Sequence, residues 1–320
     1  MLPTNTLTRR IRFIALMLIA SCVLSSCSEE EINAGAVPAP GPDLIVFHKA
    51  NLQPEGIEYD AGGERFVVGS RTEGTIHTVD DAGNIDLLVA NPGLTSSLGM
   101  QIDEQRLVVA GTIGTATIGL GIYDLETGAV LQVVDLSAVA GAGGHLANDV
   151  ALDHDGNAYV TDTLAPVLYR VTPDGQAGRF AEDARFTLLN GIAFHPNGYL
   201  IVATITGPHL LRVRIDAPDE VTEVETPFSV TGDGIAFRSD GVLAVVSNAL
   251  AADGTVIGPG VTLFRSEDDW QSAVVAGSWV ATDTPTTAAV RGGDVHVIYA
   301  HLFDPTRTEY EIVKALFDEQ

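Results

Sequence analysis

An internal repeat is the feature of this 320-residue sequence that most constrains its fold. Each copy reads as a polar residue, a small residue, an apolar strand, a turn and a second apolar strand. Six copies begin at Glu55, Leu98, Asn148, Asn190, Asp233 and Thr286, with spacings of 43, 50, 42, 43 and 53 residues. Short strands repeated with a period of this size are typical of propeller blades. The sequence therefore predicts an all-β, six-bladed propeller.

The turns and further strands of each copy fit four strands per blade. Three hairpins carry pairs that tolerate the positive φ angles of tight turns: Asp155-Gly156, Asn197-Gly198 and Asp240-Gly241. Third strands are expected at Gly74–Val79, Val167–Val171 and Leu210–Ile215, and a fourth at Asn84–Val89. The last copy ends after a third strand, Glu309–Leu316. Because Asp43–His48 reads as a strand before the first copy, we expect this segment to complete the last blade and close the ring.

The first 27 residues are expected to be a targeting segment rather than part of the fold. Arginines precede an apolar run, Ile11–Leu24, that is too short to span a bilayer comfortably. The run leads into Leu24-Ser25-Ser26-Cys27, which resembles a bacterial lipobox and predicts lipidation of Cys27. Cys22 is a weaker alternative, and a plain secretory signal is the other interpretation. We therefore expect an exported bacterial lipoprotein, periplasmic or at the cell surface.

The predicted organisation is a signal peptide over residues 1–27, a flexible tether over 28–42 and the propeller over 43–320. The formal net charge of −25 disfavours binding to nucleic acid or to anionic lipid headgroups. Contact with a membrane is accordingly expected through the lipid anchor alone.

The first residue of each repeat indicates a metal site. In a propeller this residue lies at one mouth of the central channel, and four of the six carry a carboxylate or a carboxamide: Glu55, Asn148, Asn190 and Asp233. Carboxylates mixed with amides suit Ca²⁺, whereas the absence of His and Cys from these six positions argues against zinc or copper. The alternative is that Asn and Asp here only form turns, which explains Glu55 poorly.

These motifs resemble those of the senescence marker protein (regucalcin), gluconolactonase and paraoxonase-like superfamily of calcium-dependent propellers. The resemblance is carried by PEGIEYD at Pro54–Asp60, NDVALDHDGNAYVTD at Asn148–Asp162, LNGIAFHPNGYLIV at Leu189–Val202 and GDGIAFRSDGVLAVVSN at Gly232–Asn248. It implies that Glu55, Asn148, Asn190 and Asp233 hold a divalent cation, most often Ca²⁺. It also implies hydrolysis of a lactone, ester or phosphotriester, with Asp233 as the catalytic carboxylate.

Other polar residues are expected around the same mouth, where the second strand of each hairpin ends. They are Ser70, Asp162, Thr204, Asn248 and His301. His301 is the first candidate for proton transfer and His145 the second, although both also fit exposed loop histidines. The connections Ala138–Ala147 and Ala249–Gly260 are lid candidates. Five other histidines are interpreted as structural: His77, His154, His195, His209 and His296.

The sequence thus predicts a metal-dependent hydrolase acting on a small lactone or ester. The sugar-lactone hydrolases of the superfamily that this sequence resembles carry a substrate-gripping arginine in the second blade. No arginine in Leu98–Leu120 matches it, because Arg106 is expected at a strand start. This departure from the resemblance argues against gluconolactone as the substrate. The alternative is a non-catalytic, metal-stabilised propeller that binds a ligand or an unknown protein.

Overall fold

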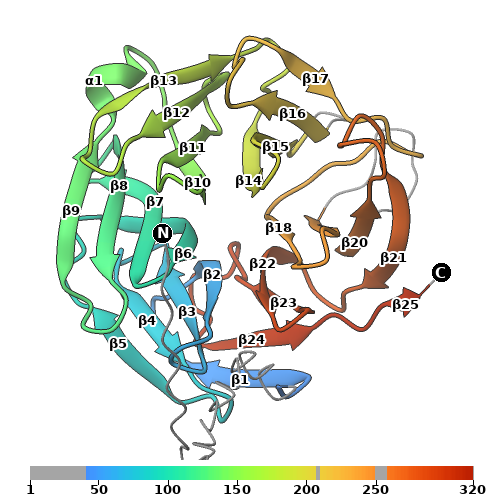
Figure 1. Cartoon of the computed structure of the whole chain (residues 1–320). Coiled ribbons are helices and arrows are strands. Elements are labelled where there is room, and N and C mark those ends of the chain that lie inside the picture. The colour runs from blue at the N-terminus through green and yellow to red at the C-terminus, as the bar shows by residue number, and fades with distance from the viewer. Residues whose placement is uncertain (1–40, 207–209, 249–257, 320) are drawn as a thin grey trace, which may run out of the picture. The chain divides into compact units, whose positions relative to one another are not determined.

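The structure of the protein is a computed structural model that describes residues 41–206, 210–248 and 258–319. These residues belong to the unit Val37–Gln320. They form six antiparallel sheets around a common axis, which confirms the six-bladed propeller (Figure 1). The predicted targeting segment, the predicted lipidation site Cys27, nearly all of the predicted tether, and His209 lie outside the described residues.

The strands follow one another outward in each blade. Blade 1 comprises β2 (Pro54–Asp60), β3 (Arg65–Ser70), β4 (Ile76–Val79) and β5 (Ile85–Val89). Blade 2 comprises β6 (Ser96–Asp103), β7 (Arg106–Ile113), β8 (Thr117–Asp124) and β9 (Val130–Asp135). Blade 3 comprises β10 (Ala147–Leu152), β11 (Ala158–Asp162), β12 (Val167–Val171) and β13 (Ala177–Glu182).

The remaining blades differ in their outer strands. Blade 4 comprises β14 (Leu189–His195), β15 (Tyr199–Thr204), β16 (Leu210–Arg214) and β17 (Val221–Glu223). Blade 5 comprises β18 (Ile235–Phe237), β19 (Leu243–Ser247), β20 (Gly260–Arg265), β21 (Val274–Val280) and β25 (Asp318–Glu319). Blade 6 comprises β22 (Pro285–Arg291), β23 (Asp294–Tyr299), β24 (Glu309–Lys314) and β1 (Leu44–His48).

Closure of the ring occurs in blade 6, as predicted. Strand β1 pairs with β24 in antiparallel register, from Leu44 opposite Val313 to His48 opposite Glu309. The predicted third strand ends at Lys314 rather than Leu316, because the chain then leaves blade 6 and pairs as β25 with β21. This extra strand of blade 5, like the short helix α1 (Ser137–Ala140), was not predicted.

The predicted turn chemistry is present in the hairpins. Gly156, Gly198 and Gly241 have φ angles of 76°, 87° and 80°, values that glycine adopts without steric penalty. The third strand of blade 1 begins at Ile76 rather than Gly74. Gly74 itself has φ 71° and its N–H donates to the carbonyl of Ser70, so it belongs to the preceding turn.

The hydrophobic core is divided among the interfaces between blades. Within the described part of the chain, six clusters of buried apolar side chains each join two successive blades. Inner and second strands are apolar on both faces because each is covered by two neighbouring blades. Among the described residues, no helix is long and apolar enough to cross a membrane.

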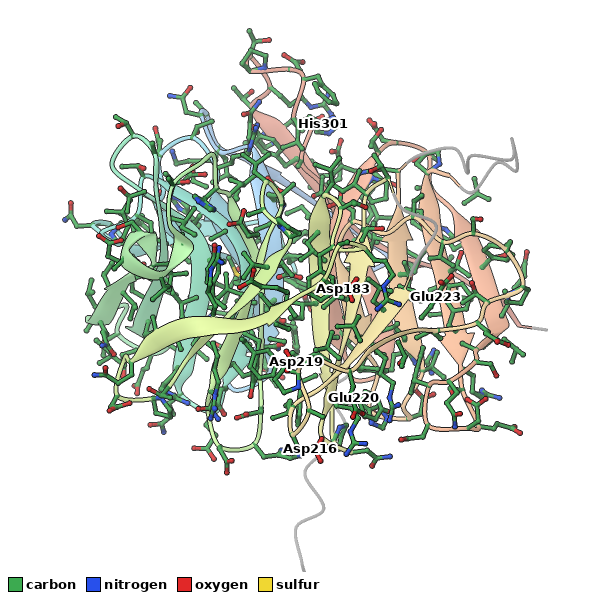
Figure 2. The ribbon with its side chains drawn as sticks, turned by 90° about the horizontal axis from the view of Figure 1, so that it is seen from above. Asp183, Asp216, Asp219, Glu220, Glu223 and His301 are labelled. Carbon is green, nitrogen blue, oxygen red and sulfur yellow. The ribbon has the colours of Figure 1, made fainter. Side chains whose placement is uncertain are left out.

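The two faces of the ring are distinguished by the direction of the strands. Each inner strand begins at one end of the axis, here called the first mouth, and ends at the other, called the second mouth. His301, just past β23, and Asp216, just past β16, lie toward opposite faces in the side view (Figure 2). The residues predicted to bind a metal stand at the beginnings of inner strands, and thus at the first mouth.

Candidate functional site

A β-bulge lies at the start of five inner strands. Register shifts fall between Pro54 and Ile57, Ser97 and Met100, Ala147 and Val150, Leu189 and Ile192, and Pro285 and Thr287. Each shift contains the residue that the repeat singled out. Bulges bend a strand and redirect a side chain, and they are common beside active sites. In blade 5 the corresponding Asp233 precedes β18, and its N–H donates to the carbonyl of Val246 at 2.8 Å.

The second residue of the repeat is glycine in four blades because the next blade is too close for a side chain. A Cβ at Gly56 would lie 1.9 Å from the carbonyl oxygen of Leu98, and one at Gly191 would lie 2.3 Å from that of Asp233. Such distances are sterically forbidden. The first residues can therefore approach one another closely at the first mouth.

Asp233 is the centre of the hydrogen-bonded group at this mouth. The amide nitrogen of Asn248 donates to Oδ2 of Asp233 at 2.5 Å, and the Asn190 side chain hydrogen-bonds the same carboxyl group. Burial raises the pKa of the Asp233 carboxyl well above its ordinary value, and the nearby charge of Glu55 raises it further. The two amides oppose these effects by stabilising the carboxylate.

Glu55 supplies the second buried carboxylate. Burial raises its pKa, and Arg71, whose Nε lies 3.6 Å from Oε2 of Glu55, partly reverses the shift. Arg71 is itself 44% exposed in its side chain, so solvent screens its charge. The mouth therefore holds two carboxylates whose repulsion is incompletely neutralised.

Asn148 is oriented by the neighbouring strand. Its amide nitrogen donates to Oγ1 of Thr163 at 2.9 Å, and Thr163 in turn donates to the carbonyl of Leu189 at 2.7 Å. Because the nitrogen is engaged there, the carbonyl oxygen of the Asn148 amide is available to the mouth.

This donor set fits a hard divalent cation. Two carboxylates and two or three amides provide oxygen ligands of the kind Ca²⁺ prefers, and a cation would neutralise the repulsion between Glu55 and Asp233. No group of three His, Cys, Asp or Glu side chains able to hold a metal is found in the described part of the chain. A cation here would consequently depend on amide oxygens, with Asn190 turning its oxygen rather than its nitrogen toward the ion.

His145 and Asp162 form a buried dyad at the same face. His145 Nδ1 lies 2.7 Å from Oδ2 of Asp162, and the hydroxyl of Tyr169 donates to the same oxygen at 2.9 Å. The other carboxylate oxygen of Asp162 accepts backbone N–H groups, from Leu146 and two residues of the following turn. Asp162 is thus a fully buried anchor rather than an exposed rim residue. Nε2 of His145 is buried and has no hydrogen-bond partner among the described residues.

His301 has other partners than the Asp233 group. Its Nε2 lies 3.0 Å from Oε2 of Glu311, and its Nδ1 lies 3.5 Å from Oδ2 of Asp283. Its φ of 47° is in the left-handed region, which is unfavourable for a non-glycine residue. Within the described residues, no recorded contact joins it to Asp233.

The other predicted rim residues are buried. The hydroxyl of Ser70 donates to the carbonyls of Asn51 and Leu52 and accepts the N–H of Glu73, so it shapes a turn. Thr204 is fully buried, and its hydroxyl has no partner among the described residues. Part of the second lid candidate, residues 249–257, lies outside the described residues.

Two carboxyl groups deeper in the channel were not predicted as site residues. Burial raises the pKa of Glu58 to about 8 and that of Asp149 to about 7. Asp149 occupies the second position of its repeat, where four blades have glycine, and this departure was the available signal. Glu58 is the fourth residue of its repeat, a position at which four of the other repeats have alanine.

The structure is therefore a six-bladed propeller that has a cluster of carboxylate and amide side chains at one end of its axis. The family described as the SMP-30/gluconolactonase/LRE-like region matches residues 53–249. The chain belongs to this family.

Curated relatives include uncharacterized Na⁺/H⁺ exchangers of Mycobacterium bovis and Mycobacterium tuberculosis, each 36% identical over 148 residues. The match covers 43% of this chain, and the chain spans only 26% of the length of each exchanger.

Solved structures share the fold at low sequence identity. The allergen Mala s 1 of Malassezia sympodialis has a TM-score of 0.70 at 20% identity, covering 87% of this chain and 97% of that one. A gluconolactonase of Xanthomonas campestris has a TM-score of 0.60 at 18% identity, covering 85% and 89%. A calcium-binding regucalcin of Agrobacterium tumefaciens has a TM-score of 0.58 at 16% identity, covering 83% and 91%.

Proposed function

We propose that the protein is a cation-dependent hydrolase of a lactone or related ester, with its site at the first mouth. The observation that carries this proposal is the position of Asp233. Its carboxyl group is buried beside Glu55 and is oriented by the amides of Asn190 and Asn248. Membership of a family that includes gluconolactonases supports the reaction class.

In this proposal Glu55, Asn148, Asn190 and Asp233 hold a divalent cation, and their oxygen donors favour Ca²⁺. When bound, the cation polarises the substrate carbonyl and stabilises the oxyanion that develops. Its charge also favours ionisation of Glu55 and Asp233, whose pKa values burial raises in its absence.

Asp233 acts as the catalytic carboxylate, either activating water or attacking the carbonyl carbon. The hydrogen bond from Asn248 fixes the direction of one carboxylate oxygen and leaves the other for the reacting atom. His145 is the second proton-transfer candidate. In the tautomer whose Nδ1–H donates a hydrogen bond to Asp162, Nε2 is the nitrogen that can act as a base, as in other carboxylate–histidine pairs. His301 is less suited, because acidic residues flank both of its ring nitrogens.

The test is a hydrolysis panel comprising an aryl ester, γ- and δ-lactones and a phosphotriester, each with and without chelator. Wild type is compared with Asp233→Asn and with Asp219→Asn, which removes one exposed carboxylate far from the mouth. We expect turnover that the chelator abolishes and that Asp233→Asn reduces about 10²-fold or more, while Asp219→Asn matches wild type.

Two results would overturn the proposal. Bound cation without turnover of any substrate class would favour the alternative, a metal-stabilised binding propeller. Failure of the protein to bind Ca²⁺ would exclude both versions of the site.

We also propose that the chain is exported and anchored through a lipid on Cys27. The support is the sequence of residues 1–27. Metabolic labelling with a fatty acid should label wild type and Cys22→Ser but not Cys27→Ser. The reverse pattern would move the anchor to Cys22, and no label in any of the three would exclude lipidation.

A further inference from the structure

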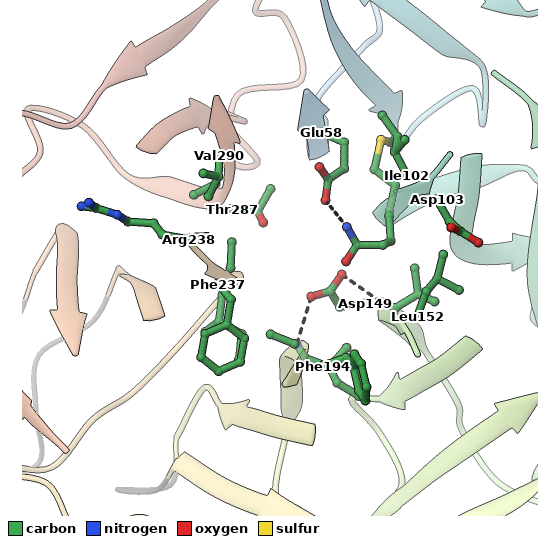
Figure 3. Close-up of a pocket in the computed structure, with 18 of the residues that line it drawn as sticks. Glu58, Ile102, Asp103, Asp149, Leu152, Phe194, Phe237, Arg238, Thr287 and Val290 are labelled. Atoms are coloured by element: carbon green, nitrogen blue, oxygen red, sulfur yellow. Dashed lines mark hydrogen bonds between the residues drawn. The ribbon is translucent and has the colours of Figure 1, made fainter. Parts of the chain in front are cut away.

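A cavity lies at the second mouth, at the opposite end of the axis from the Asp233 group. Its volume is about 740 Å³, within the range of pockets that enclose small organic ligands. It is lined by the later residues of inner strands and by the hairpin turns that follow them, among them Asp103, Asp153 and Ser239. Figure 3 shows Glu58, Asp149 and Thr287 around its interior.

Differences among the repeats create the cavity. Three residues after the start of the repeat, blades 1 and 2 carry Glu58 and Gln101, whereas blades 4 and 5 carry Ala193 and Ala236. The two short side chains leave open the space that the two long ones border. The cavity is thus one-sided, with polar groups on blades 1 to 3 and apolar groups on blades 4 and 5.

The polar side of the cavity presents carboxyl groups with no basic partner. Oε1 of Glu58 accepts the amide of Gln101 at 3.0 Å. The oxygens of Asp149 accept the N–H groups of Val150 at 2.8 Å and Ile192 at 3.1 Å. In the described part of the chain neither carboxyl group forms a salt bridge, and the hydroxyl of Thr287 has no recorded hydrogen bond. The two carboxyl groups are held in place by hydrogen bonds, without a basic partner.

The rest of the cavity lining is aromatic and aliphatic. Phe194 and Phe237 lie on the side of Asp149 (Figure 3), and Ile235 and Val290 extend the apolar lining. A bare metal ion would leave most of this volume filled with water against apolar walls. A cation attached to an apolar body would contact both sides, and aromatic faces also attract cations.

The rim of the cavity favours positive charge. Among the described residues, its acidic lining residues are Asp103, Glu104 and Asp153, and its lining holds one arginine, Arg238. Asp103 pairs with Arg106, which leaves Glu104 and Asp153 as the described acidic groups of the rim without an arginine partner. Arg238 pairs with Asp240 at 2.9 Å, and its side chain extends away from Glu58 and Asp149 (Figure 3). A cleft lined by one sign of charge concentrates ligands of the opposite sign.

We propose that this cavity is a second ligand site, for an organic amine whose ammonium group pairs with Glu58 and Asp149 and whose apolar body packs against Phe194 and Phe237. It is separate from the hydrolytic site proposed above, and neither proposal depends on the other.

The experiment titrates three probes of similar shape into the full-length protein with chelator present: phenethylammonium, 2-phenylethanol and 3-phenylpropionate. Binding is followed by calorimetry. We expect phenethylammonium to bind at least about tenfold more tightly than the neutral alcohol, and the carboxylate not to bind. Equal binding of the cation and the alcohol, or no binding of the cation, would overturn the proposal.

Two variants locate the site. Glu58→Gln keeps a hydrogen-bonding side chain beside Gln101 but cannot ionise when the ammonium group binds, and should weaken phenethylammonium binding about tenfold or more. Ala236→Leu should block binding by filling the apolar part of the cavity. This variant tests the site independently if Glu58→Gln does not fold. Asp219→Asn is the control for loss of one charge, and Asp233→Asn separates the two sites. Asp219→Asn and Asp233→Asn should both bind the amine as wild type does. Unchanged binding in Glu58→Gln and Ala236→Leu would show that the amine binds elsewhere.

Discussion

Nδ1 of His145 lies 2.7 Å from Oδ2 of Asp162, while the other ring nitrogen of His145 is buried without a hydrogen-bond partner among the described residues. Asp162 is fully buried and also accepts the hydroxyl of Tyr169 and three backbone N–H groups. One carboxylate therefore organises both the histidine and the turn after β11.

Replacing Asp162 with asparagine should destabilise the protein. The amide keeps one acceptor oxygen. Its NH₂ group, however, would face hydrogen-bond donors, where the carboxylate has a second acceptor oxygen. We expect the free energy of unfolding to fall by about 2–3 kcal/mol in urea titrations. Asp219→Asn, which changes an exposed carboxylate, should stay within about 0.5 kcal/mol of wild type. Equal stability of Asp162→Asn and wild type would contradict the bonding described for this carboxylate.

Calcium should raise the melting temperature through the first mouth. A cation that binds only the folded state at about one hundred times its Kd adds about 2.7 kcal/mol to stability. The shift should disappear in Asp233→Asn and persist in Asp219→Asn, as measured by scanning calorimetry with and without chelator. A shift that survives in Asp233→Asn would place the ion at another site.

Gly191→Ala tests the close approach of blades 4 and 5. The new Cβ would lie 2.3 Å from the carbonyl oxygen of Asp233, so the strands must separate. We expect a loss of about 1–3 kcal/mol in unfolding free energy, together with weaker Ca²⁺ binding. Gly178→Ala in β13 is the matched control, since a Cβ there meets no atom within 4 Å. Similar behaviour of the two variants would refute the packing argument.

His296 should make the protein sensitive to acid. It is fully buried against Phe66, neither ring nitrogen has a partner in the described structure, and burial lowers its pKa to about 4 from the ordinary value of 6.5. The unfolded chain therefore binds a proton at a higher pH than the folded chain. Stability contributed by neutral His296 is complete above about pH 6.5 and is lost progressively as the pH falls toward 4, by about 3 kcal/mol in all.

His296→Phe should remove most of this loss. The measurement is the unfolding free energy of both proteins at several pH values between 7.5 and 4.5. A shallower acid slope is expected for the variant, with the remaining slope including His77, whose pKa burial also lowers to about 4. Parallel slopes would show that His296 does not titrate on unfolding.

The fold was predictable because its information is local and repeated. Spacing, turn pairs and the unmatched strand Asp43–His48 were enough to predict six blades and their closure. The convergence of Asp233 with Glu55 and Asn190 followed from the same alignment, because equivalent positions in a propeller lie at one end of its axis.

The partners of individual side chains were not predictable, because they depend on loop conformations that the repeat pattern does not specify. Glu311 and Asp283, which flank His301, belong to β24 and to the segment before β22. The carboxyls of Glu58 and Asp149 were missed for another reason. The alignment was used to find positions that agree, whereas these two are informative because they differ.

The pairing of β1 with β24 also sets an order of events during folding. Leu44 lies opposite Val313. Strand β1 is synthesised before the other described strands, and it can pair only after β24, one of the last strands, has been synthesised. Until then its backbone N–H and C=O groups are unpaired and open to association with other chains. The ring is therefore completed only after synthesis of the sixth blade, and contacts between residues so far apart in the chain favour slow folding.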